Sequence, residues 1–488
     1  MVTLGKITGW QPSAGPVTTW MASAAAHDAA RNARRSDLPP TYQRARHLRA
    51  AYDGKAVGRQ LPRLMVVAWD IPGVCDIAAM TATINAHVRR NDTYHDWFEF
   101  ENDVIVRRTI DNPEAIDLVP TEFGQMDADQ IRAHALTTTP ETLEWDCFTF
   151  GIVQHADHFS FYASVDHLHI DGMSAGLIFF DIQLTYQAKA NGTEGEEAGP
   201  AIFPQTASYR GYAQRQHEKL AGLTLASPEV EAWVEFTRDT EGEWPSFPLP
   251  LRTSETDTTG DFLTVDLLDA AETESFDTAC RAAGARFSGG VLACAALTEH
   301  ELTGNDTFHG FTPYDTRTPA LDSMTVGWFA SLFPVTVPTV AGSFPEAARA
   351  AQESFDGAKH LAAVPLDRVI ELADPRGIWI EPPTARAMMV SFIDFRAVPA
   401  ADLLDQNNFG TYADNLSHGG INLWINRHAD KTTATISFPD NAEARASVQH
   451  YLEALTRSFA RAVKTTSDWV DAVAAHANCG HRAPAINA

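Results

Sequence analysis

Two histidines and two aspartates follow a strand-like run in the stretch FSFYASVDHLHIDG, residues 159–172. Apolar and polar residues alternate along this run, which places His167 on one face of a β-strand and Asp166 on the opposite face. Histidine suits proton transfer, because its pKa lies near neutrality and its neutral form offers an acceptor nitrogen. Gly172 indicates a sharp turn after Asp171, so Asp171 can return towards the backbone around His167. This arrangement permits general-base catalysis by His167.

Two other interpretations of the same stretch stay open. A histidine on an apolar strand face is often a hydrogen-bonded core residue. On a continuing strand, His167 and His169 would lie on one side and bind a metal, with Asp166 or Asp171 as a further ligand. The turn at Gly172 and the lack of a second His/Cys cluster count against a metal, and none is expected. No cysteine lies near this stretch in the sequence, so the sequence favours a base acting directly on bound substrate.

The elements that must position these residues mix strands and helices without a strict βαβ rhythm. Residues 63–70 predict a buried strand, and Ile77, Met80, Ile84 and Val88 form one face of the helix after it. Further strands are predicted at 104–110, 148–155 and 159–167, before a long apolar helix. The second half predicts strands at 262–268, 307–312, 332–337, 388–395, 421–427 and 433–438, and helices at 272–283, 288–302, 344–360 and the C-terminal end. This mixture favours mixed sheets with packed helices over a doubly wound parallel fold.

The length of 488 residues exceeds what one hydrophobic core usually supports. Residues 188–206 and 242–261 are rich in Gly, Pro or charged residues and lack periodicity, as surface connections do. The sequence therefore predicts an N-terminal half at 1–205, a connecting segment at 206–260 and a C-terminal half at 261–488.

The composition excludes several classes of protein. With 63 acidic and 37 basic side chains the net charge is -26, so nucleic acid is not an expected partner. An anionic CoA thioester would need a local basic pocket. No apolar run is long enough to span a bilayer, and the five scattered cysteines indicate a reducing compartment without disulfides. We expect a cytoplasmic protein, with at most peripheral association at the inner face of the cell membrane.

Four segments of the chain resemble motifs of one acyltransferase superfamily. DHLHIDG, residues 166–172, resembles the HHxxxDG signature of the condensation-domain superfamily, which includes chloramphenicol acetyltransferase, with Asp166 in place of the first histidine. FTPYDTRTP (311–319) and VGWFASLFPVTVP (326–338) resemble its second-half arginine segment and the buried strand after it. NNFGTY (407–412) stands where a DFGWG-like motif would be, with Asn408 replacing the aspartate.

Over residues 9–463 the chain is similar to the mycobacterial polyketide-associated protein acyltransferases, which build trehalose-based cell-envelope lipids. The similarity is carried by HVRRNDTYHDWFEF (87–100), WDCFTFGIVQ (145–154), GARFSGGVLACAAL (284–297) and FPDNAEARASV (438–448). It implies an α/β fold of two chloramphenicol-acetyltransferase-like subdomains, arranged as a V-shaped pseudo-dimer with an active-site channel at their interface.

The resemblance also implies roles for individual residues. His167 is the expected general base, and Asp171 is a structural residue ion-paired with Arg317. Gly172 would keep the turn tight beside the thioester. Asp166 faces away from the base, so its replacement is expected to be mild.

Two further groups of residues are candidates with weaker support. A donor phosphate could bind at the start of the second-half helix, at Arg281, Arg286, Ser288, Gly289 and Gly290. The alternative for the two glycines is close helix packing. The loop at Asn408, Phe409 and Gly410 is expected to join the two halves through neutral hydrogen bonds.

The function predicted on these grounds is transfer of a fatty acyl group from acyl-CoA to a hydroxyl of a trehalose-like acceptor. It needs no covalent acyl-enzyme and no cofactor beyond the donor substrate. Three alternatives remain: acyl transfer from a carrier protein, a non-catalytic scaffold of a lipid-assembly complex, and a metallohydrolase. A polyketide synthase and a lipid exporter are candidate partners.

Overall fold

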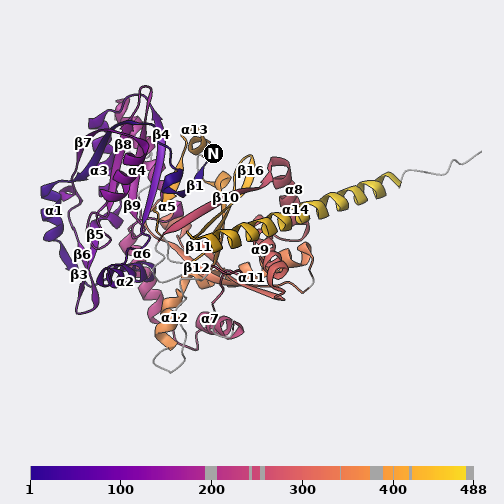
Figure 1. The fold of residues 1–488 in the computed structure, drawn as a ribbon. Coiled ribbons are helices and arrows are strands. Elements are labelled where there is room, and N and C mark those ends of the chain that lie inside the picture. The colour runs from indigo at the N-terminus through magenta and orange to yellow at the C-terminus, as the bar shows by residue number, and fades with distance from the viewer. Residues whose placement is uncertain are drawn as a thin grey trace, which may run out of the picture.

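The computed structural model describes residues 2–192, 206–240, 244–252, 259–340, 342–373, 388–398, 401–416 and 420–479, with the backbone alone for 465–479. Figure 1 shows two lobes side by side, the first from the indigo-to-magenta half of the chain and the second mainly from the orange-to-yellow half. The last helix, α14 (Ala442–Cys479), projects away from the second lobe.

Across the described residues the first lobe is built on a seven-stranded mixed sheet. Its strands lie in the order β1 (Thr3–Lys6), β14 (Gly410–Ala413), β4 (Leu64–Pro72), β9 (His158–Asp166), β8 (Phe148–Gln154), β2 (Gly15–Ala22) and β7 (Leu118–Met126). β9 is the central strand and runs antiparallel to both neighbours, with Val165 paired to Met65 and Phe148. The motif from Asp166 to Gly172 therefore begins at the end of the central strand of this sheet.

Helices and a small second sheet complete this lobe. The helices are α1 (Ala24–Arg31), α2 (Tyr42–Ala56), α3 (Ile77–Arg90), α4 (Ala128–Thr137) and α5 (Gly172–Ala190), and the small sheet contains β3 (Arg34–Ser36), β6 (Val104–Thr109) and β5 (Asp96–Glu101). Trp69 of β4 packs on Phe161 of β9 and Phe179 of α5, with ring centroids 4.5 and 5.2 Å apart. This aromatic packing fixes α5 against the strand that delivers His167.

The second lobe has a six-stranded mixed sheet among its described residues. Its order is β10 (Gly260–Asp269), β16 (Lys431–Pro439), β15 (Asn422–Arg427), β13 (Met389–Asp394), β11 (Thr307–Asp315) and β12 (Ala330–Pro338). It carries helices α8 (Ala270–Ala282), α9 (Phe287–Thr303), α10 (Pro319–Asp322), α11 (Phe344–Ala358) and α12 (Leu366–Ala373). Leu403 and Leu404 of α13 (Ala401–Gln406) instead pack on the core of the first lobe. The six strands predicted for this half are all present. Val448, Leu452, Leu455 and Phe459 of α14 lie in the core, with Val463 partly buried.

One strand breaks the predicted division into halves. β14, from the C-terminal half, enters the first sheet between β1 and β4, parallel to β1 and antiparallel to β4. The two lobes are therefore joined by backbone hydrogen bonds, and residues 261–488 do not form one lobe by themselves.

Two segments for which no helix or strand was predicted contain regular structure. The N-terminal 60 residues form β1, β2, β3, α1 and α2, and the predicted connecting segment contains α6 (Tyr209–Ala221) and α7 (Pro228–Asp239). The predicted boundary at residue 205 lies outside the described residues. Ile77, expected in the buried face of α3, is 36% exposed, whereas Met80, Ile84 and Val88 are fully buried.

The four cysteines with described side chains, Cys75, Cys147, Cys280 and Cys294, are free and buried. Burial raises the pKa of each of these thiols. Among the described helices, none combines the length and the apolar character that crossing a membrane requires.

Candidate active site

His167 follows directly after the last residue of β9. Its backbone N–H donates to the carbonyl oxygen of Arg63, 2.7 Å away, which continues the pairing of β9 with β4 by one residue. Its ring packs on the indole of Trp328, with ring centroids 4.0 Å apart. Nδ1 is buried and bonds to no other described residue, while Nε2 is neither buried nor hydrogen-bonded there. Nε2 is thus the nitrogen that a ligand can reach.

The surroundings keep the His167 ring neutral. Desolvation, and after it the nearby His47 imidazole, lower its pKa to about 4. Its own backbone and the carboxylates of Asp171 and Asp166 act in the opposite direction without outweighing burial. At pH 7 the ring is therefore unprotonated and able to accept a proton.

Asp171 is the N-cap of α5 and the centre of a buried ion pair. Its carboxylate accepts from the Ser174 N–H at 2.8 Å, as a helix cap does. Both oxygens accept from Arg317, each at 3.0 Å, and one also accepts from the Phe329 and Ala330 N–H groups. Burial raises the pKa of Asp171, but Arg317 and the N–H donors outweigh it, so its pKa lies below the ordinary value. The ion pair predicted from the sequence is present.

Arg317 joins the first lobe to the second-lobe segment before β12. Besides Asp171, its guanidinium donates to Asp315 at 3.0 Å and to the Ser174 hydroxyl at 2.7 Å, and it lies over the Phe329 ring. Arg317 and Asp171 have side chains only 3% exposed. The loop after His167 is therefore fixed by contacts from both lobes.

Gly172 has a different role from the one expected. It is the first residue of α5, its φ is not positive, and nothing lies within 4 Å of the position that a Cβ would take. The turn itself does not require glycine. The open, exposed position leaves space beside the helix start.

His169 points away from His167, against the metal interpretation. It is fully buried, its Nδ1 lies 3.2 Å from the Thr93 hydroxyl, and its ring packs on Tyr94 and Phe148. Within the part of the chain that the structure describes, no three His, Cys, Asp or Glu side chains gather as a metal site would need.

Asp166 lies at the centre of a buried network. One oxygen accepts from His47 Nε2 at 2.8 Å, and the other accepts from the Thr142 hydroxyl at 2.7 Å and from Arg63 at 3.3 Å. Its side chain is 0% exposed. We therefore expect its loss to cost stability, because replacement would leave the buried Thr142 hydroxyl and the Leu168 N–H without this acceptor.

The structure separates the predicted donor-binding residues into two groups. Arg286 and Ser288 line a hollow of about 400 Å³ together with Lys359, Tyr314 and other second-lobe residues. Arg281, 74% exposed, instead pairs with Asp277 on its own helix.

The two glycines of this predicted site serve helix packing. A Cβ on Gly290 would overlap Sγ of Cys280, and one on Gly289 would lie 2.9 Å from Gln352 Oε1. The alternative interpretation, close packing, explains both positions.

The loop at Asn408 joins the lobes as expected but not through neutral bonds alone. The Asn408 amide donates to the Asp70 carboxylate at 2.8 Å. Phe409 is 3% exposed and packs on Phe179, and Gly410 begins β14. A carboxylate acceptor makes the Asn408 bond stronger than the predicted neutral contact.

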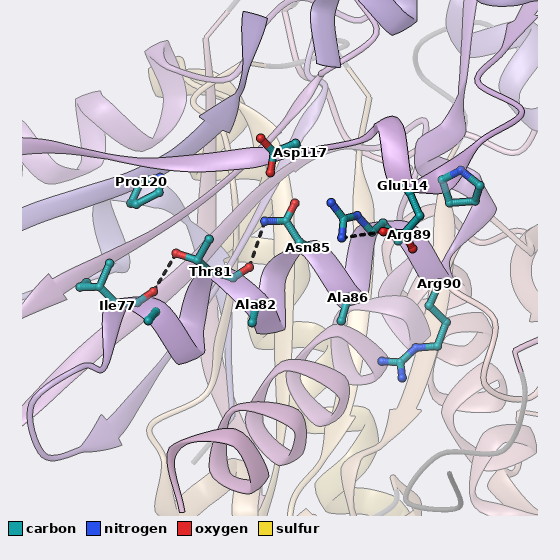
Figure 2. A pocket seen from close by; sticks show the side chains of 12 residues that line it. Ile77, Thr81, Ala82, Asn85, Ala86, Arg89, Arg90, Glu114, Asp117 and Pro120 are labelled. Carbon is teal, nitrogen blue, oxygen red and sulfur yellow. Dashed lines mark hydrogen bonds and ion pairs between the residues drawn. The ribbon is translucent and has the colours of Figure 1, made fainter. Parts of the chain in front are cut away.

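A larger, shallow groove lies elsewhere, on the outer face of α3. Figure 2 shows Ile77, Thr81, Ala82, Asn85 and Ala86 along the helix, with the segment at 113–120 opposite. Its volume is about 1100 Å³. None of the residues predicted for catalysis or donor binding is among those that Figure 2 draws.

The sequence missed two residues of the site, His47 and Trp328. His47 lies on α2, in a stretch for which no element was predicted. Its ring is hydrogen-bonded to Asp166, which is 119 positions away in the sequence. Trp328 belongs to the segment VGWFASLFPVTVP, which the resemblance had marked without giving the tryptophan a role. The strong N-terminal signal for α2 was Thr41, whose hydroxyl caps the helix.

Comparisons with known proteins agree with this fold. Residues 64–377 match the family model of the condensation domain. The chain is 43% identical over 469 residues to acyltransferase PapA3 of Mycobacterium tuberculosis, covering 95% of this chain and 97% of that protein. It is 43% identical over 468 residues to trehalose-2-sulfate acyltransferase PapA2 of Mycobacterium bovis, covering 96% and 98%.

A solved structure of a PapA2 acyl transferase superposes with a TM-score of 0.89 at 44% identity, over 94% of this chain and 99% of that one. The predicted fold class, two chloramphenicol-acetyltransferase-like subdomains, is thereby confirmed.

Proposed function

The chain belongs to the condensation-domain family, among relatives of the mycobacterial Pap acyltransferases, and from this premise we propose that it transfers a fatty acyl group from acyl-CoA to a hydroxyl of a trehalose-like glycolipid. The observation that carries the proposal is the neutral His167 ring with an accessible Nε2. The relatives' names, which include a trehalose-2-sulfate acyltransferase, support the acceptor class.

In the proposed reaction His167 Nε2 takes the proton of the acceptor hydroxyl as its oxygen attacks the thioester carbonyl carbon. The new C–O bond pushes an electron pair onto the carbonyl oxygen. The tetrahedral intermediate then re-forms the carbonyl and breaks the C–S bond, and His167 returns the proton to the departing sulfur. No acyl-enzyme forms, because alignment of the two substrates replaces a covalent relay.

The environment of the ring suits this role. A base of pKa about 4 is unprotonated across the neutral range. Asp171 and Arg317 hold the following loop without touching Nε2, so they act as positioning residues.

The three rivals differ in observable ways. A carrier-protein donor would give activity with acyl carrier protein and none with acyl-CoA. A scaffold would be inactive with every donor, and a metallohydrolase would lose activity to chelators. A polyketide synthase and a lipid exporter remain proposed partners, and the cytoplasmic face of the membrane the proposed location.

The proposed function is tested by the products of the wild-type protein. Trehalose and 2-sulfated trehalose are each offered with acyl-CoAs of increasing length, and the products are identified by mass spectrometry. We expect an acyl ester on the sugar and one free CoA per ester. Ester formation with acyl carrier protein alone would favour the first rival.

Arg286 is proposed to bind a phosphate of the donor at the rim of the 400 Å³ hollow. Arg286 and Lys359 both pair with Asp356, each at 2.8 Å, so the phosphate would replace this carboxylate as their partner. Arg286→Gln is expected to raise KM for acyl-CoA about tenfold with kcat little changed, because a hydrogen bond to a charged group is worth about 1.5 kcal/mol.

The matched control is Arg281→Gln, which removes the same charge five residues earlier from a side chain outside the residues lining the hollow. Its KM is expected to stay within about twofold of wild type, since an exposed pair contributes little. Equal effects of the two variants would place the phosphate elsewhere.

A further inference from the structure

A second imidazole lies beside His167, on a helix that the sequence did not predict. α2 is held in place by Arg44, whose Nε donates to the Leu168 carbonyl at 2.7 Å, and by Leu48, which packs with Leu168 in a small buried cluster. His47 lies between these two anchors. The anchors fix His47 against the chain segment that carries His167.

The contacts of His47 orient its ring. Nε2 is hydrogen-bonded to Asp166 Oδ1 at 2.8 Å, whereas Nδ1 is neither buried nor bonded to a described residue. The His47 and His167 ring centroids are 6.5 Å apart, and Trp328 packs against both rings, 5.7 Å from the first and 4.0 Å from the second. Both rings thus pack on the same indole, and each has one nitrogen that is accessible and not hydrogen-bonded to a described residue.

Their hydrogen-bond partners differ. His47 is bonded to the Asp166 carboxylate, while His167 contacts no carboxylate directly. Two neighbouring titratable groups in different surroundings are a common basis for separate catalytic roles. An imidazolium that is bonded to a carboxylate through one nitrogen has a second N–H to donate.

We propose that His47 is a second catalytic residue, which donates its Nδ1–H to the thioester carbonyl oxygen as that oxygen becomes an oxyanion. This proposal rests on the proposed acyl transfer. His47 keeps its proton throughout: the hydroxyl proton goes to His167 and then to the leaving sulfur, and the electron pair on the oxyanion returns to the carbonyl. Asp166 is the positioning residue that holds the ring.

The test compares His47→Gln with wild type. Glutamine keeps an amide that can bond Asp166 but has no positive charge, so a merely structural role would survive. We expect a fall in kcat of about 10²-fold, the usual loss on removing one oxyanion donor. His27→Gln is the matched control, because His27 also faces an aspartate, Asp146, in the same lobe, away from His167; its kcat should be unchanged.

A pH profile supplies a readout that a structural role would not move. The titratable groups that act on His167 are His47, Asp166 and Asp171, and Arg63 and Arg317 pair with these two carboxylates. Loss of the His47 charge removes a repulsion that lowers the His167 pKa, so the acid limb of kcat/KM should shift upward from about 4. NMR titration of the His167 ring measures the same shift without turnover, and so reports on His47 even if the wild type makes no ester.

A kcat within about twofold of wild type for His47→Gln would overturn the assignment. So would an unchanged His167 titration, whatever the rate. The proposed function fails separately, by the absence of ester from the wild-type protein.

Discussion

His167→Ala is expected to abolish acyl transfer while the protein keeps its fold. General-base assistance is worth about 10²- to 10⁴-fold, and the remaining alignment of substrates cannot remove the hydroxyl proton. The ring is partly exposed and contacts Trp328 without holding a buried polar network, so its loss should cost little stability. Ester formation measured by mass spectrometry, with circular dichroism for the fold, gives the comparison.

The control for this variant is His158→Ala, at a partly exposed hairpin position where His158 pairs with its neighbour Asp157. It should behave as wild type in both measurements. Turnover of His167→Ala near the wild-type rate would refute the general-base assignment. A covalent acyl adduct on the wild-type protein, seen by intact-protein mass spectrometry, would refute direct transfer.

Asp171→Ala is expected to cost about 3–5 kcal/mol of stability as well as rate, because it removes the buried carboxylate partner of Arg317 and leaves Asp315, whose side chain is 42% exposed. The carboxylate also caps α5 and accepts from two N–H groups of the second lobe, and these donors lose their acceptor too. The measurement is the thermal melting temperature beside kcat. Arg317→Ala should have a similar effect, and the double variant should cost less than the sum of the two.

An exposed ion pair of the same type is the control. Asp111→Ala removes the partner of Arg34, where both side chains are more than half exposed. Its cost should lie below about 1 kcal/mol. A loss of rate in Asp171→Ala with an unchanged melting temperature would show that the pair is not structural.

The sequence predicts those parts of this molecule that depend on local pattern. Strand alternation placed Phe159, Phe161, Ala163 and Val165 in one buried cluster, and the structure has them there. The Asp171–Arg317 pair was also predicted, although 146 positions separate the residues, because both lie in segments that resemble one family. Where a short motif determines the backbone conformation, the positions of its side chains can be predicted as well.

What the sequence did not predict depends on contacts between distant segments. α2 is rich in arginine and weakly amphipathic, so it reads as polar loop, yet Arg44 is fully buried over the Tyr209 ring, 4.0 Å from its centroid. Tyr209 belongs to α6, in the segment taken for a linker. The role of His47 could be seen only after both helices were in place.

The order of synthesis also matters for this chain. Residues 1–409 must leave the ribosome before β14 exists, and until then β4 has an unpaired edge where β14 will lie. Unpaired strand edges promote association with other chains. A product cut short before residue 410 should therefore be prone to aggregate, because the first sheet closes only when most of the second lobe has been made.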